Sequence, residues 1–114
     1  MSQTQAFGRG TVVLLTLTAP REKFWGAILD LTPAGVSVRG VELNSFADFA
    51  QQLRSDEPVS PAVMFFPMHR VERMEMDAPS GLIPSLAEQF EMKSGKTVAS
   101  VLGLARAESG GGGA

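Results

Sequence analysis

Four basic side chains are the strongest candidates for chemistry in this sequence. His69 and Arg70 stand side by side, Arg73 follows three residues later, and Arg39 belongs to a separate apolar stretch. These residue types bind phosphate groups, provided that the segments carrying Arg39 and Arg73 lie near each other. Acidic residues are interleaved with the same arginines, at Glu72, Glu75 and Asp77. The alternative is therefore a solvated strand face with cross-strand ion pairs.

Aromatic side chains could add stacking platforms for unpaired bases. Trp25 is the single tryptophan, and Phe65 and Phe66 form a pair inside an apolar stretch. Exposed rings stack on bases, whereas in a domain of this size the same rings could fill the core or a subunit interface. The candidate nucleic-acid-binding set consists of His69, Arg70, Arg73, Arg39 and Phe66.

Motifs for catalysis or metal binding are weak. The sequence has one histidine and no cysteine, which excludes disulfides, thiolate metal sites and cysteine nucleophiles. Gly95-Lys96-Thr97 resembles the end of a phosphate loop, but the glycine that the full motif needs five residues earlier is Phe90. Carboxylate pairs such as Asp56-Glu57 have no second polar constellation with them. We expect a non-catalytic protein with no cofactor and no metal.

The composition of the whole chain limits these candidates. The 114 residues are 44% hydrophobic and carry a net charge of -2, which suits one small domain and argues against binding nucleic acid by bulk charge. No apolar run approaches the roughly 20 residues of a membrane span, and no leader-like segment begins the sequence. We therefore expect a cytoplasmic protein that does not bind membranes. Residues 1–10 predict a flexible arm, and residues 96–114 predict a marginal helix followed by a disordered glycine-rich tail.

Five short strands are predicted between these ends. Residues 11–18, 24–31 and 35–43 are rich in β-branched and apolar side chains and are separated by turn residues. Residues 62–77 are interrupted near Pro67, which predicts two strands joined by a tight turn. The phase of the apolar residues changes at Gly40, and this predicts a bulge or sharp bend. The predicted fold class is mainly β with added helices, built on a strongly bent, five-stranded small barrel.

Helical patterns interrupt and follow the strands. Residues 45–54 carry an apolar stripe and begin at Asn44-Ser45, which could cap a helix between the third and fourth strands. Residues 85–94 begin with the capping box Ser85 to Glu88 and stop at Gly95. Thr97–Ala107 is amphipathic but short, so we expect it to need a partner surface, which could belong to another protein.

Two segments resemble the motifs of Sm-like proteins, the family that includes the Hfq and LSm proteins. Trp25-Gly26-Ala27-Ile28, followed across a turn by Gly35-Val36-Ser37-Val38, resembles the first motif. Met64 to Met74 resembles the second, an apolar strand, a sharp turn and a final strand, with His69 as the counterpart of the histidine in that turn. The sequence departs from the family at Thr32, where an aspartate is typical, and in its helices.

The resemblance implies an Sm-like barrel over residues 11–95, a ring formed by pairing of edge strands, and a role connected with RNA. The methionine-rich block supplies adaptable apolar side chains for a subunit interface, and the candidates are Met64, Phe65, Phe66, Met74 and Met76. The expected function is a self-assembling interaction or scaffold module with RNA as a candidate ligand. The alternatives are an RNA chaperone-like protein and a monomeric SH3-like domain that binds proteins.

Overall fold

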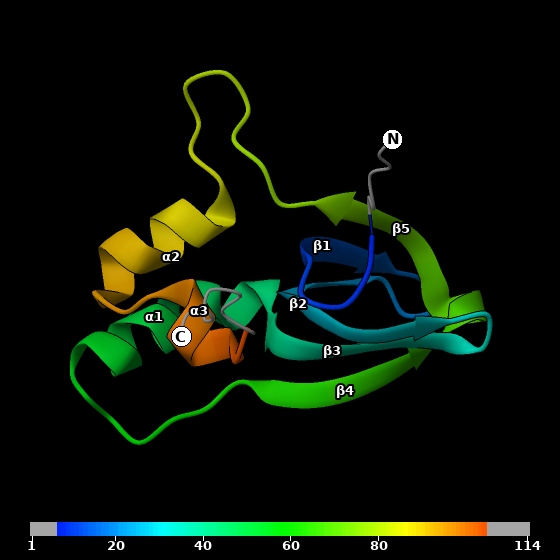
Figure 1. Cartoon of the computed structure of the whole chain (residues 1–114), viewed down its shortest axis with the longest axis horizontal. Coiled ribbons are helices and arrows are strands. Elements are labelled where there is room, and N and C mark those ends of the chain that lie inside the picture. Colours follow the sequence, from blue (N-terminus) through cyan, green and yellow to red (C-terminus); the bar gives the residue numbers. More distant parts are fainter. Residues whose placement is uncertain (1–6, 105–114) are drawn as a thin grey trace, which may run out of the picture.

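The computed structural model describes residues 7–104, and these residues are mainly β. Five antiparallel strands form one sheet in the order β4-β3-β2-β1-β5 (Figure 1). Their bounds are β1 (Val12–Leu17), β2 (Glu22–Thr32), β3 (Gly35–Glu42), β4 (Ala62–Pro67) and β5 (Val71–Met76). Each strand is joined to its neighbours in this order by a ladder, so β3, β2 and β1 lie inside the sheet and β4 and β5 form its edges.

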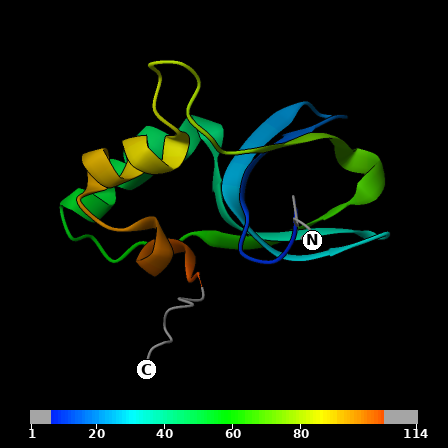
Figure 2. The ribbon, with the colours of Figure 1, turned by 45° about the horizontal axis from the view of Figure 1, so that its top comes forward.

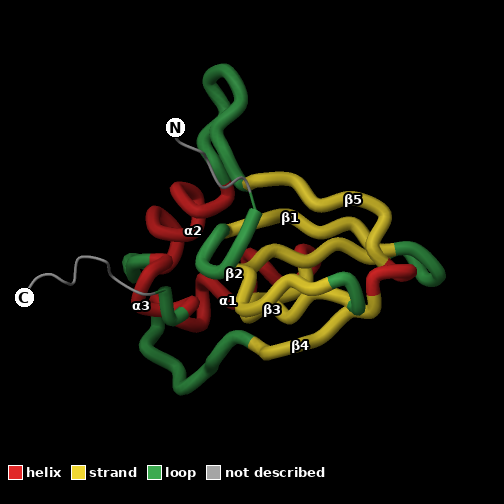
Figure 3. The backbone as a smooth tube through the Cα atoms, turned by 45° about the vertical axis from the view of Figure 1, so that its right-hand side comes forward, coloured by secondary structure: helices red, strands yellow, loops and turns green. Residues whose placement is uncertain are grey.

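The sheet is strongly curved but not closed. A short 3₁₀ turn, η2 (Met68–Arg70), joins β4 to β5 at one end of the sheet. From there the two strands run along opposite edges, and no ladder joins them (Figure 3). The five strands predicted from the sequence are therefore present, but they form an open curved sheet and the barrel predicted for them is not closed.

One face of the sheet forms the first apolar core, which the curvature of the strands encloses (Figure 2). Alternate residues of β1 and β2 point into it, including Leu15 and Ile28, both almost completely buried. Phe66 of β4 closes one side, with its ring centroid 4.9 Å from that of Phe24. Such alternation is expected of strands with one set of side chains on each face.

The opposite face of the same strands forms a second core under three helices. These are α1 (Phe46–Arg54), preceded by the 3₁₀ turn η1 (Leu43–Ser45), α2 (Leu86–Ser94) and α3 (Val98–Leu102). Trp25 of β2 is fully buried there, with its ring centroid 5.2 Å from those of Phe46 and Phe90. The helices cover only one end of the sheet (Figure 1). Among residues 7–104, no helix has the length and apolar character needed to cross a bilayer.

Two glycines bring β2 and β3 unusually close. Gly26 is paired with Gly40, and a Cβ on Gly40 would lie 2.0 Å from the carbonyl oxygen of Trp25. A bulge at Gly40, one of the two alternatives predicted there, is absent, because the ladder is regular at this residue and shifts instead between Ile28 and Asp30. The apolar pattern misled because Val38 and Val41 belong to opposite faces of β3, and both faces are buried at this point.

The ends of the helices agree only partly with the predicted caps. The capping box is formed: the amide of Glu88 donates to Ser85 Oγ at 3.0 Å, and the amide of Ser85 donates to Glu88 Oε1 at 2.8 Å. Gly95 ends α2 in the left-handed conformation. Ser45 precedes α1 but makes no side-chain capping bond, because the chain enters the helix through η1.

The two terminal segments are partly described. Residues 7–10, assigned to the arm, form a turn against β2, in which the amide of Gly10 donates to the carbonyl of Ile28 at 2.8 Å. In the predicted helix Thr97–Ala107, α3 ends at Gly103, and its Val98 and Leu102 are buried in the chain's own second core. The remainder of both predictions, residues 1–6 and 105–114, lies outside the described residues.

Candidate functional site

The predicted basic set does not form one strip. Arg39 lies on β3 and Arg73 on β5, and β2 and β1 separate these strands. In the ladders, Arg39 pairs with Ala27 and Ala27 with Val12, whereas Arg73 pairs with Thr16, farther along β1. The condition for a shared phosphate strip, that these two segments lie near each other, is not met.

Carboxylates accompany the remaining arginines. Arg70 Nη2 lies 2.8 Å from Glu22 Oε1, and Arg73 Nε lies 2.8 Å from Glu75 Oε2. The ion pairing of the alternative is therefore present, but the Arg70 pair is partly buried and the Arg73 pair lies within β5 rather than across strands. His69 is exposed in η2. Within residues 7–104, no group of three or more potential metal-binding side chains occurs.

The predicted interface residues divide between core and surface. Phe66 is 9% exposed, and Met64 and Met74 are half-buried against the first core. A role for Phe66 in stacking or assembly would require its ring to leave that core. Phe65 and Met76 remain exposed, by 54% and 47%.

The two edge strands therefore combine open backbone with exposed apolar side chains. In the described part of the chain, β4 pairs only with β3, and β5 only with β1. Val63 on β4 is 59% exposed, and sequence reasoning did not single it out. Unpaired strand edges with exposed apolar side chains favour pairing with another strand.

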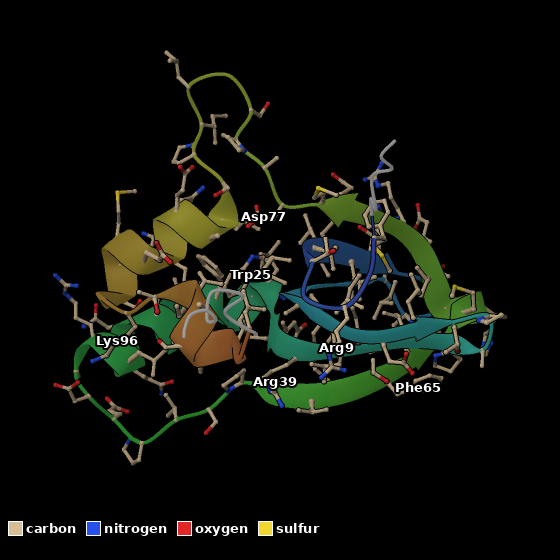
Figure 4. The ribbon with its side chains drawn as sticks, in the orientation of Figure 1. Arg9, Trp25, Arg39, Phe65, Asp77 and Lys96 are labelled. Atoms are coloured by element: carbon tan, nitrogen blue, oxygen red, sulfur yellow. The ribbon has the colours of Figure 1, made fainter. Side chains whose placement is uncertain are left out.

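A cavity of about 650 Å³ lies where the helical layer ends and the outer face of β2 and β3 becomes uncovered. Arg9 and Arg39 line it, together with Thr11, Ile28, Leu29 and Leu102, and both arginines are labelled in Figure 4. Arg9 Nη1 donates to the carbonyl of Leu29 at 3.1 Å, and Arg39 Nη1 donates to that of Leu102 at 3.2 Å. No carboxylate is among its described lining residues.

Sequence reasoning missed Arg9 because two glycines and polar neighbours placed it in a flexible arm. The only local signal was Thr11, whose Oγ1 accepts a 3.2 Å hydrogen bond from the amide of Gly8 and so closes the turn that carries Arg9. The hydrogen bond of Arg9 is to Leu29 on β2, which is distant in sequence. No local pattern could therefore predict it.

Comparisons with models of known protein families, with curated proteins and with solved structures find no match to this chain. Any assignment of function therefore rests on the geometry of the two open edges and of the cavity.

Proposed function

We propose that this chain is a non-catalytic interaction module that assembles with copies of itself, β4 of one copy pairing with β5 of the next. The observation that carries the proposal is the pair of open edges, each bearing a large exposed apolar residue, Val63 on β4 and Met76 on β5. Strand addition satisfies the edge hydrogen bonds and removes these side chains from water.

The two edges are different strands, so this pairing is heterologous. A heterologous contact builds a closed ring when its rotation closes and a filament when it does not. Because the sheet is strongly curved, its two edges are rotated relative to each other. A rotation of this kind between successive copies favours a closed ring. The Sm-like resemblance also implies a ring of small barrels. We propose further that the protein assembles in the cytoplasm.

Light scattering after size-exclusion chromatography, at high micromolar concentration, tests the assembly. The wild-type chain is expected to elute with a mass several times its own 12.1 kDa. Val63→Lys places a charge on the β4 edge, and Met76→Lys places one on the β5 edge. Both side chains are largely exposed, so the fold is expected to persist while each variant becomes monomeric.

Mixing the variants distinguishes the mode of pairing. The β4 edge of the Met76→Lys chain remains intact, as does the β5 edge of the Val63→Lys chain, so an equimolar mixture should give dimers. Leu82→Lys is the matched control, because Leu82 is fully exposed on the loop between β5 and α2, outside both edge strands. A monomeric wild-type chain would contradict the proposal, as would dimers of Met76→Lys alone, which would indicate β4-to-β4 pairing. A monomer would favour the SH3-like alternative.

RNA binding remains a second prediction rather than the preferred function. His69 is exposed, but Arg70 and Arg73 are already engaged by carboxylates. Fluorescence anisotropy with short U-rich and A-rich RNA at low salt tests it, and binding that weakens steeply with salt would support an RNA-chaperone role.

A further inference from the structure

We infer that the cavity between Arg9 and Arg39 binds a small organic anion, with a carboxylate or phosphate group at the two guanidinium groups and an apolar body against the cavity wall. This inference goes beyond self-assembly, because neither arginine lies on β4 or β5.

The charge of this cavity differs from the charge around three other arginines, which lie on β5 or next to the ends of strands. Arg21, Arg70 and Arg73 each lie within 3.2 Å of a glutamate oxygen. Arg9 and Arg39 instead donate to backbone carbonyls, which leaves their positive charges uncompensated by any described lining residue. Two such guanidinium groups in one hollow raise the local concentration of anions.

Both guanidinium groups at the cavity donate to backbone carbonyls. Arg39 packs against the backbone at the end of α3, where a Cβ on Gly103 would lie 2.6 Å from its Nη1. The glycine and the carbonyl of Leu102 therefore restrict the Arg39 guanidinium, and the carbonyl of Leu29 accepts a hydrogen bond from the exposed Arg9. Each group uses one of its five N–H donors in these bonds, and the others suit the oxygens of a carboxylate or phosphate.

The size and wall of the cavity indicate the rest of the ligand. A volume of about 650 Å³ is in the range of small-molecule sites. The partly exposed side chains of Leu29 and Leu104 provide an apolar wall, whereas Ile28 and Leu102 are 0% exposed and belong to the two cores. Such a wall suits a ligand with a short hydrocarbon part more than an inorganic ion alone.

Arg39 also caps the carbonyl end of α3, and that role alone would explain its position. Arg9 distinguishes the two explanations, because it is exposed and contacts no helix through a described hydrogen bond.

Hexanoate, hexyl phosphate, inorganic phosphate and neutral hexanol are suitable probes. Titration of the full chain by calorimetry and by backbone amide NMR at low salt measures their affinities.

Hexanoate or hexyl phosphate is expected to bind and to shift the amide signals of Gly10 and Gly103, and hexanol is not. A preference between the two anions identifies the headgroup, and weaker binding of inorganic phosphate reports the apolar wall. Arg9→Ala should weaken anion binding at least about tenfold. Arg73→Ala, an exposed arginine outside the cavity, is the control and should bind as the wild type does.

Three results would overturn the inference. These are the absence of binding by both organic anions, equal binding of hexanol, and unchanged affinity in Arg9→Ala. Arg39→Lys supplies a second check, because it keeps the charge but loses the planar fork. It should weaken anion binding while its urea midpoint stays near that of the wild type.

Discussion

The indole Nε1 of Trp25 donates a 3.1 Å hydrogen bond to Asp77 Oδ2, and this bond connects the centre of the sheet to the residue that follows its edge strand β5 (Figure 4). The same carboxylate accepts from the amides of Leu86 and Ala87, both at 2.8 Å. Asp77 thus joins the buried tryptophan to the first turn of α2, where a negative charge is favourable.

Replacing Asp77 should loosen the helical layer. Asp77→Ala leaves the indole N–H and two helix amides without their acceptor, so we expect the free energy of unfolding to fall by about 3 kcal/mol. Asp77→Asn keeps one acceptor oxygen and should cost about half as much. Urea unfolding followed by Trp25 fluorescence measures both, and Glu75→Ala, an exposed neighbour, serves as control. Equal stability of Asp77→Ala and Glu75→Ala would show that the three bonds do not hold the layer.

The glycine pair should not tolerate a side chain. In Gly40→Ala the new Cβ would meet the carbonyl oxygen of Trp25 and the Cα of Gly26, which are backbone atoms and cannot turn aside. We expect a loss of about 3 kcal/mol or more in thermal or urea unfolding. Gly8→Ala is the control, since nothing lies within 4 Å of its added Cβ. A loss of similar size in Gly8→Ala would assign the effect to glycine replacement in general.

One buried hydroxyl offers a route to higher stability. Thr16 is 0% exposed, and its Oγ1 has no hydrogen-bond partner among the described residues. Thr16→Val replaces the hydroxyl by a methyl group of similar shape, so stability should rise by about 1 kcal/mol. Thr18→Val, at an exposed position just after the same strand, should change it little. Destabilisation by Thr16→Val would contradict the conclusion that this hydroxyl is unsatisfied.

The contact of α3 with its own domain can be tested at Leu102. This side chain is 0% exposed in the second core, so Leu102→Ala should reduce the free energy of unfolding by about 3 kcal/mol. Ser100→Ala, on the exposed side of α3, should have little effect. If both variants match the wild type in urea, α3 does not contribute to the isolated domain, and the segment would instead be available to a protein partner.

Asp56 should titrate below its usual range. Its hydrogen bond from Lys96 Nζ, at 2.7 Å, and the charge of that ammonium group lower the pKa of the carboxyl. A folded-state pKa below the unfolded one stabilises the protein above the unfolded value, and this stabilisation is lost as the pH falls through the folded one. Carboxyl NMR titration should show the pKa of Asp56 returning to its ordinary value, near 3.8, in Lys96→Met. An unchanged pKa in that variant would contradict the pairing.

Local patterns predicted most of the elements, because they depend on neighbouring residues. The β-branched run at 11–18 and the turn residues around Pro20 and Pro33 determine where β1 and β2 stop. Ser85 and Glu88 form their cap within a single turn. Such features need no knowledge of the rest of the chain.

The arrangement across the sheet could not be predicted in this way. The separation of Arg39 from Arg73 follows from strand order, and the packing of Arg9 follows from the path of the N-terminal turn over β2. Asp77 looked like one more acid among exposed arginines, although its partners are the indole of Trp25 and the start of α2. Long-range contacts decide these roles, and composition does not encode them.

The five consecutive buried residues Phe24 to Ile28 on β2 have a further consequence. In a sheet with one face exposed to solvent, shifting a strand by one residue would expose its apolar side chains. The hydrophobic effect alone therefore prevents such a shift of register. At these residues both faces of β2 are buried, so a β2 shifted by one residue would still bury apolar groups. Gly26 opposite Gly40 supplies the missing constraint, because only in the native alignment does each close approach meet a residue without a side chain. Steric exclusion at one point thus takes the role that polarity has in most sheets.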